Sequence, residues 1–376
     1  MKKIITILLS MCMLLCLLGC QRNVATDTQP PTDDTVAQNT PAVILGVPFT
    51  AVSVPTVTDE VKAEDGTVIF TKGHQDISMT LSGQAAADQI VLDFLNRIDA
   101  GCANADSILT AAKSAYASKG SSDNWIPYSC SIRFEPTRID QAVLSLFGNN
   151  ISYTGGSHPD YRCVAINYNL ITGEALSLGS ILTGVDGVDQ LRKLVLSDLE
   201  TQKQEKYLRE GYEETVNQRF AGEESHDYNW YFSDEGICFY FAPYEIAPYS
   251  SGVIVAQVPY EQLVGIITDE FFPPERQNLS GTMEFVSFDS NNNQYEHISE
   301  LILDNGGQMH ALQTDSCVQD IRIIVTDPLT YEDHTVYAAL YLNPQEAIVI
   351  QSNDTQLRNM HVEYQSNGET VSLPLA

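Results

Sequence analysis

The sequence predicts an α+β fold, in which antiparallel sheets pack against helices and a small mainly-β domain follows at the carboxyl end. Two observations favour this class. Short runs that alternate apolar and polar residues recur along most of the chain, and only a few segments have the spacing of an amphipathic helix. Strands and helices also do not alternate regularly, as a parallel sheet would require.

The first residues, MKKIITILLSMCMLLCLLGC, have the pattern of a secretory signal, with two lysines before an apolar run. The run ends in Leu-Leu-Gly-Cys, which resembles a bacterial lipobox. We therefore expect residues 1–19 to be a lipoprotein signal peptide and Cys20 to carry the lipid. An uncleaved membrane anchor is the alternative, but the apolar run is shorter than the ~20 residues that span a bilayer. The sequence thus predicts an extracytoplasmic protein, lipid-anchored to the cell membrane of a bacterium.

Residues 20–41 are rich in Thr, Asp, Gln, Asn and Pro and hold few large apolar side chains. Such a segment cannot bury enough surface to fold, so we expect a disordered tether. The rest of the chain is long enough for two or three domains. We expect an amino-terminal module at 42–152, a second domain at 153–274 and a β-rich domain at 277–376.

The amino-terminal module begins with β-like runs such as TVIFTKG. Apolar residues at helical spacing then predict a helical segment at 84–119, which Gly101 should divide into two helices. The runs YSCSIRFEP and AVLSLFGNN predict two strands after it.

In the second domain, the run YRCVAINYN meets a Thr-Gly turn at 172–173, which is a hairpin signal. We expect helices at 188–209 and 260–271, and strands at 229–242 and 253–258. Pro273 and Pro274 should close the last helix. The runs TMEFVSF, DIRIIVTDP, TVYAALYLN and AIVIQSN then predict the β-rich domain.

The chain is strongly acidic, with a net charge of −29. This charge argues against nucleic-acid binding, which needs a basic face, and it would attract cationic partners, although acidity can also follow from general proteome composition. Beyond Cys20 the cysteines are odd in number and lack the spacing of metal or redox sites, and no disulfide is indicated. They are Cys102, Cys130, Cys163, Cys238 and Cys317.

The segment YFAPYEIAPYSSG at 240–252 repeats Pro-Tyr within a stretch rich in aromatic residues. Most of the aromatic side chains before Pro243 are expected in the core, because alternation places them on buried faces. Pro243 and Pro248 cannot donate to a ladder, so the strand should leave its sheet near Pro243. We expect an extended loop that projects Tyr244 and Tyr249 and loses little entropy on binding, although it could equally clasp the sheet edge.

Two stretches, SYTGGSHPDYRCVAINYNLITGEALSL and FYFAPYEIAPYSSGVIVAQVPYEQL, resemble the extracytoplasmic domain shared by the anti-sigma factor RsiV and the peptidoglycan deacetylase PdaC. Residues 42–152 resemble, more loosely, the PdaC-like module that precedes this domain. The resemblance implies a domain that binds lysozyme or accompanies an enzyme of the cell wall. The chain departs from both relatives, because only three residues precede the apolar run and its histidines are all solitary. We therefore expect neither a sigma-binding segment nor the deacetylase metal site.

The leading hypothesis is a non-catalytic lipoprotein that binds either a lysozyme-like cationic muramidase or the peptidoglycan glycan. The alternatives are an enzyme or accessory subunit acting on peptidoglycan sugars, and a structural interaction protein of the envelope. No nucleophile signature is present, paired carboxylates cannot be judged by counting, and no cofactor is expected. The expected ligand contacts are Tyr244, Glu245, Ile246, Pro248 and Tyr249, with His158 of the GGSHPDY turn nearby.

One weak metal signal occurs in DSNNNQYEHISE, where Asp289, Asn291, Asn293 and Glu300 stand at ligand positions of a calcium loop. Gln294 replaces the glycine that the sharp turn needs, and a strand precedes the loop instead of a helix. A hairpin loop explains the same residues.

Overall fold

The computed structural model describes residues 49–120, 124–221, 230–292, 295–328 and 330–376. Residues Pro41–Ala376 form one compact unit. The expected signal peptide, Cys20 and the tether lie outside the described residues. Among the helices that are described, none is long and apolar enough to cross a membrane.

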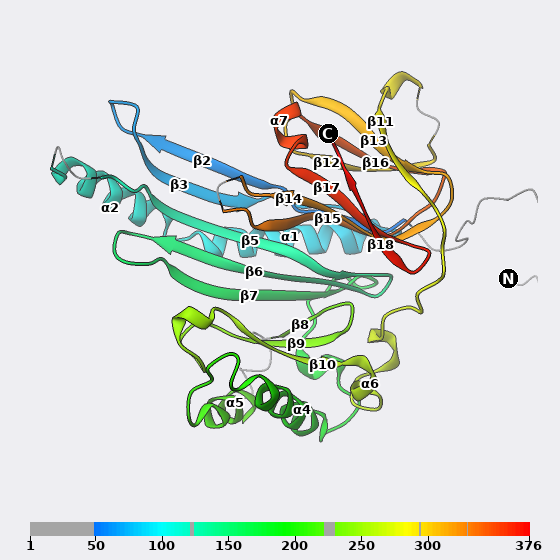
Figure 1. The fold of residues 1–376 in the computed structure, drawn as a ribbon, viewed down its shortest axis with the longest axis horizontal. Coiled ribbons are helices and arrows are strands. Elements are labelled where there is room, and N and C mark those ends of the chain that lie inside the picture. The colour runs from blue at the N-terminus through cyan, green and yellow to red at the C-terminus, as the bar shows by residue number, and fades with distance from the viewer. Residues whose placement is uncertain (1–48, 121–123, 222–229, 293–294, 329) are drawn as a thin grey trace, which may run out of the picture. The chain divides into compact units, whose positions relative to one another are not determined.

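The first layer is a five-stranded sheet in the order β2-β3-β5-β6-β7 (Figure 1). Cys130, Ile132 and Phe134 alternate along β5 and pack against the two helices that cover one face of the sheet. Strands β3 and β5 pair in parallel, because the two helices connect them in the chain. The other neighbouring strands of this sheet are antiparallel. The elements are β2 (Thr56–Lys62), β3 (Val68–Gln75), α1 (Gln84–Gly101), α2 (Ala105–Ser118), β5 (Tyr128–Ile139), β6 (Val143–Tyr153) and β7 (Asp160–Asn169).

The second layer is a three-stranded antiparallel sheet in the order β10-β9-β8. Its strands are rich in aromatic residues and buried on both faces. Trp230, Phe239 and Phe241 pack on the helical side, and Tyr231 and Tyr240 pack toward β6 and β7. Figure 1 shows α4 and α5 on the side away from the five-stranded sheet. The elements are α3 (Leu178–Ile181), α4 (Gly187–Gln202), α5 (Tyr212–Ala221), β8 (Trp230–Phe232), β9 (Gly236–Phe241), β10 (Ile254–Pro259) and α6 (Tyr260–Leu263).

The carboxyl-terminal part forms two sheets over a common core that includes Leu312, Ile323 and Ile348. Two short strands from the start of the chain complete the larger sheet, whose order is β18-β17-β14-β15-β1-β4, and the smaller has the order β11-β13-β16-β12. The elements are β1 (Ala51–Ser53), β4 (Ser78–Thr80), β11 (Met283–Ser287), β12 (His297–Ile302), β13 (Gln308–Thr314), β14 (Val318–Thr326), β15 (Asp333–Leu342), β16 (Glu346–Ser352), α7 (Asp354–Leu357), β17 (Met360–Ser366) and β18 (Glu369–Pro374).

The α+β class is confirmed, and so is the break after the first helix. Gly101 lies close to β5, because a β-carbon there would stand 2.4 Å from Ile132 Cδ1. The boundaries of the domains stay a prediction. The expected division at 152/153 falls inside the β6–β7 hairpin, and β1, near the start of the described chain, pairs with β15 of the carboxyl-terminal part.

Three predictions of single elements are wrong. The helix expected at 188–209 ends at Gln202, and the chain then turns through Tyr207, whose φ is 54°, before α5, which was not predicted. The helix expected at 260–271 is reduced to one α-helical turn, α6, and a separate 3-10 turn at Asp269–Phe271, because Gly265 has a φ of 77° and reverses the chain between them. Within the strand expected at 229–242, the described residues form two strands, β8 and β9, joined by a turn.

Candidate functional site

The loop between β9 and β10 is a compact turn. Phe241 is the last paired residue of β9, and Pro243, which has no N–H to donate, follows two residues later. Tyr244 has a φ of 72°, and the Glu245 N–H donates to the Ala242 carbonyl at 3.0 Å. The prediction of an extended loop is therefore wrong: the backbone turns tightly at Tyr244 and again in the 3-10 turn Tyr249–Ser251.

The middle of the loop is fixed to the body of the protein. Ile246 is fully buried in the aromatic core, and its carbonyl accepts a hydrogen bond from the Arg209 N–H at 2.8 Å. The Glu245 carboxylate accepts from the Ala242 N–H at 2.9 Å and pairs with the Arg219 guanidinium at 2.5 Å. Ile246 and Glu245, both expected ligand contacts, thus hold the loop from beneath.

The tyrosines on either side of this anchor remain at the surface. Tyr244 is 52% exposed, Tyr249 is half-buried, and their ring centroids lie 5.3 Å apart. His158 stacks on Tyr249 with centroids 4.7 Å apart and planes inclined by 28°. The Arg209 guanidinium carbon lies 6.0 Å from the centroid of Tyr244. The structure therefore brings three of the predicted site residues into one cluster of rings, and Pro248 is exposed beside it.

His158 reaches this cluster from the β6–β7 hairpin. Gly155 and Gly156 have φ values of 88° and 120°, which side chains other than glycine rarely adopt. The Tyr153 hydroxyl donates to the Gly156 carbonyl at 3.2 Å and closes the turn. The two glycines of the GGSHPDY motif thus shape the hairpin tip that carries His158.

A cavity of about 300 Å³ lies beneath the rings. Tyr161 forms part of its wall; Asn149 Nδ2 donates to the Tyr161 hydroxyl at 3.1 Å, and burial raises the pKa of that phenol. Asp160 pairs with Arg162 at 3.5 Å, an exposed contact that leaves its carboxylate accessible. The lining residues are Ser152, Thr154, Gly155, His158, Pro159, Asp160, Tyr161, Pro243, Tyr244 and Tyr249.

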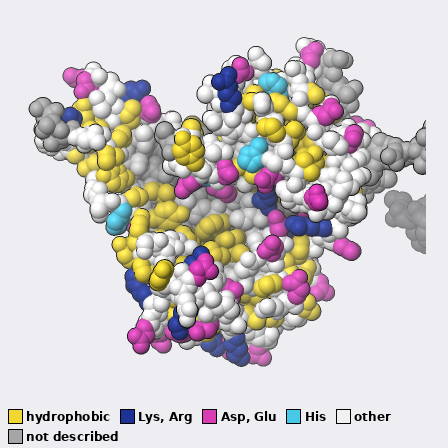
Figure 2. Space-filling view, in the orientation of Figure 1, with side chains coloured by type: hydrophobic (Ala, Val, Ile, Leu, Met, Phe, Trp, Pro, Cys, Tyr) yellow, Lys and Arg dark blue, Asp and Glu magenta, His cyan; other side chains and the backbone are white. Residues whose placement is uncertain are grey.

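Sequence reasoning missed Ser152, Thr154, Asp160 and Tyr161. They flank the glycine turn, and the pairing of Ser152 with Asp160 across the hairpin brings them to one rim. Figure 2 shows that this face of the molecule is hollowed over β5, β6 and β7, with hydrophobic side chains gathered along the hollow. Phe147 of β6 stacks on Tyr231 of β8, with centroids 4.6 Å apart. The cavity thus combines rings that can stack on a ligand with hydroxyl and carboxylate groups that can bind its polar edges.

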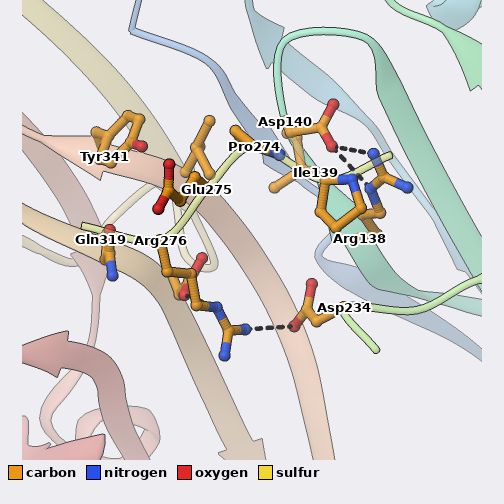
Figure 3. Close-up of a pocket in the computed structure, with 12 residues that line it drawn as sticks. Arg138, Ile139, Asp140, Asp234, Pro274, Glu275, Arg276, Gln319 and Tyr341 are labelled. Atoms are coloured by element: carbon orange, nitrogen blue, oxygen red, sulfur yellow. Dashed lines mark hydrogen bonds and ion pairs between the residues drawn. The ribbon is translucent and has the colours of Figure 1, made fainter. Parts of the chain in front are cut away.

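A second cavity, of about 190 Å³, is strongly charged, but its three aspartates are paired (Figure 3). Arg138 is 2% exposed, pairs with Asp140, and donates to the Tyr260 hydroxyl and the Phe271 carbonyl at 2.6 and 2.7 Å. Figure 3 shows Arg276 extending toward Asp234, which also pairs with Arg322 at 2.7 Å.

Asp320, on the wall of the same cavity, lies 3.1 Å from Arg276, and burial raises the pKa of its carboxyl group. Arg322 also donates to the Pro136 carbonyl at 2.8 Å, so the cluster links β14 to β5. We therefore interpret this cluster as structural, because it holds β14 against β5.

The weak calcium candidate does not assemble among the described residues, which hold no group of three or more His, Cys, Asp or Glu side chains arranged for a metal. Asp289 Oδ1 accepts from the Asn291 N–H at 2.9 Å, as in an Asx turn, and Glu300 lies exposed on β12. Asn293 is outside the described residues. A hairpin is also wrong for this segment, because β11 pairs with β13 and β12 pairs with β16.

Residues 182–261 match the family model DUF3298, described as a protein of unknown function. The esterase Rv3036c of Mycobacterium tuberculosis is 26% identical over 126 residues, which are 33% of this chain and 51% of that protein. The match therefore spans about half the length of this curated relative.

Two solved structures are also similar to the chain. A DUF3298 family member from Bacteroides fragilis has a TM-score of 0.39 and 17% identity, covering 58% of this chain and 94% of that one. A DUF3298 family protein from Pseudomonas aeruginosa PAO1 has a TM-score of 0.37 and 16% identity, covering 60% of this chain and 97% of that one.

Proposed function

We propose that this chain is a non-catalytic cell-surface lipoprotein that binds the glycan of the bacterial wall. Residues 182–261, which match the DUF3298 family model, contain the Tyr244–Tyr249 loop. The single observation that carries this proposal is the cluster of His158, Tyr244 and Tyr249 over a cavity of about 300 Å³. That volume is at the lower end of the range for small-molecule sites, so it suits one or two sugar rings.

The chemistry of the rim fits a sugar. An aromatic face packs against the apolar face of a pyranose ring, while hydroxyl and carboxylate groups accept and donate hydrogen bonds at its edge. Ser152, Thr154 and Asp160 supply such groups beside the rings. The loop is already fixed by Glu245 and Ile246, so little conformational entropy is lost when a ligand binds.

The second candidate ligand is a lysozyme-like cationic protein, which the net charge of −29 favours. Charge of one sign speeds the approach of an oppositely charged protein, and this effect weakens as salt is added. Such a partner would need to cover about 800 Å² of this chain, far more than the cavity. Tyr244, at 52% exposed, would then act as an anchor at the centre of a broader surface.

Ester hydrolysis and cleavage of wall sugars are the catalytic alternatives. Ser152, His158 and Asp160 line the same cavity, but no hydrogen bond among the described residues joins His158 to a serine hydroxyl or to Asp160. A nucleophile and its base lie within hydrogen-bond reach in most such enzymes. An envelope protein that acts purely through structural contacts would need no ligand in the cavity at all.

Calorimetric titration of Pro41–Ala376 with N-acetylglucosamine oligomers, soluble muropeptides and lysozyme tests the proposal. We expect saturable binding of the sugars, weakened about fivefold by Tyr249→Ala because a stacked ring contributes roughly 1 kcal/mol. Tyr207→Ala is the matched control, since Tyr207 is 74% exposed with a φ of 54° and lies outside the cavity lining.

The outcomes separate the candidates. Sugar binding that Tyr249→Ala leaves unchanged would remove the loop from the site. Binding of lysozyme alone, lost as salt is added, would favour the protein ligand. Release of a chromophore from a p-nitrophenyl ester, abolished by Ser152→Ala, would establish catalysis and reject a non-catalytic role.

A further inference from the structure

A third cavity, of about 360 Å³, lies where β2 and β5 meet the carboxyl-terminal sheets. Its wall is mostly apolar, with Leu303, Val325, Val336 and Met360 facing the space, and Arg133 of β5 also lines it. The cavity is separate from the ring cluster, since the two share no lining residue.

Arg133 is a half-buried cation without a partner. Among the described residues, no carboxylate lies within ion-pair distance of its guanidinium, and the guanidinium donates no hydrogen bond to them. Most arginines of the described chain that are at least half-buried pair with an acid, as Arg138, Arg219 and Arg322 do. Because the sequence holds 49 acids against 20 lysines and arginines, a partner could readily have been supplied from within the chain.

The acid nearest to Arg133 along its strand is already engaged. Glu135 lies two residues on, so both side chains leave the same face of β5. Its carboxylate instead binds β15, with His334 Nδ1 at 2.8 Å and the Thr335 N–H at 3.2 Å. Glu135 thus holds the two sheets together, and the Arg133 guanidinium remains available at the cavity wall.

We propose that this cavity binds a small monocarboxylate with a short apolar chain, whose carboxylate pairs with Arg133 and whose chain packs against Leu303, Val336 and Met360. A guanidinium forms two parallel hydrogen bonds to one carboxylate, which satisfies the unpaired arginine and neutralises its charge. The apolar part of the wall suits the chain.

A phosphate head fits less well. It carries more charge than one arginine neutralises, His334 is tied to Glu135, and Asp327 on the cavity wall would repel an additional negative charge. A cationic head would be repelled by Arg133, and the Asp327 carboxylate already accepts a hydrogen bond from the Thr330 N–H at 3.1 Å. The geometry therefore selects a carboxylate.

Calorimetric titration of Pro41–Ala376 with octanoate tests the site, with acetate, hexanoate, octylamine and octyl phosphate as comparisons. We expect affinity to rise from acetate to octanoate by roughly fourfold for each methylene group that enters the cavity. Octylamine should bind at least about tenfold more weakly than octanoate, because it lacks the group that pairs with Arg133.

Variants locate the site. Arg133→Gln should weaken the binding of octanoate about tenfold or more. The affinity of Arg133→Lys should lie between those of Arg133→Gln and the wild type, because a lysine keeps the positive charge but cannot form two parallel hydrogen bonds to the carboxylate. Lys113→Gln is the matched control, since it removes one positive charge from an exposed position of α2. Far-ultraviolet circular dichroism confirms that each variant is folded.

Three results would overturn the proposal. They are no saturable heat with octanoate at millimolar concentration, equal binding of octanoate and octylamine, and tighter binding of octyl phosphate than of octanoate. Because the ligand series uses the wild-type protein, it decides the question even if an Arg133 variant fails to fold.

Discussion

The imidazole of His158 lies face to face with the ring of Tyr249, with centroids 4.7 Å apart, although β7, α3, α4, α5, β8 and β9 lie between them in the described part of the chain. This stack joins the tip of the β6–β7 hairpin to the loop between β9 and β10. Neither segment alone encloses a cavity, so the site exists only where the two sheets pack together.

The backbone of Tyr244 stores strain that a glycine would relieve. Its φ of 72° lies in the left-handed region, which costs a non-glycine residue about 1–2 kcal/mol. We expect Tyr244→Gly to have a free energy of unfolding about 1 kcal/mol higher than Tyr244→Ala, measured by urea denaturation. The order should reverse at Tyr249, which begins a 3-10 turn, so that Tyr249→Ala is the more stable variant there. Greater stability of the alanine variant at both positions would show that the strain at Tyr244 is absent.

Much of the fold follows from local patterns. Alternation in β5 predicted a strand because it reflects burial on one face of the sheet, and the glycine that ends α1 predicted a helix break because glycine is unfavourable inside a helix. Two of the three errors lie where one glycine or one tyrosine with a positive φ reverses the chain, at Gly265 and Tyr207. The pairing of β1 with β15 joins residues almost 290 positions apart, and no local pattern encodes such a contact.

The sequence predicted only some of the residues of the candidate site. The repeated Pro-Tyr marked Tyr244 and Tyr249, because proline ends strands and exposed rings beside it stand out. The sequence also marked His158 through its glycine turn. It could not show that Ile246 points into the core, since side-chain direction in an irregular loop depends on the packing around it. It also could not show that Asp160 and Tyr161 of β7 share the cavity, because that cavity forms only where the β6–β7 hairpin meets the loop after β9.

The ion pair of Glu245 with Arg219 holds the loop in place. Their side chains are 14% and 34% exposed, so water screens the pair only in part. Glu245→Gln keeps an acceptor for the Ala242 N–H and removes the charge, so we expect a loss of about 1 kcal/mol in the free energy of unfolding. A double-mutant cycle with Arg219→Gln isolates the coupling. A coupling near zero would mean that the buried Ile246 alone fixes the loop.

Asp320 should make the protein less stable at neutral pH than at mildly acidic pH. Burial raises the pKa of its carboxyl group above the unfolded value, so the folded chain holds that proton more tightly. The contribution of this group to stability therefore falls as the pH rises from the unfolded pKa through the folded one. We expect Asp320→Asn to raise the free energy of unfolding at pH 7 and to differ less from the wild type at pH 4. Asparagine also tolerates the φ of 54° at this position. A variant that loses stability at pH 7 would show that the pairing with Arg276 outweighs the burial.

Cys163 should remain a thiol in conditions that ionise an ordinary cysteine. It lies half-buried on β7 beside the aromatic cluster, where burial and the charge of Glu245 raise its pKa to about 12. Because the thiolate is the reactive form, its alkylation by iodoacetamide should still be accelerating at pH 10 in the folded protein. The same cysteine in the urea-unfolded chain should react with a midpoint near the ordinary value of about 8.5.

Mass spectrometry of the peptide that contains Cys163 follows its rate of alkylation separately from those of the other cysteines. A native midpoint near 8.5 would mean that water reaches the sulfur and that the layer between β7 and β9 is more open than the packing of Tyr231 and Tyr240 indicates.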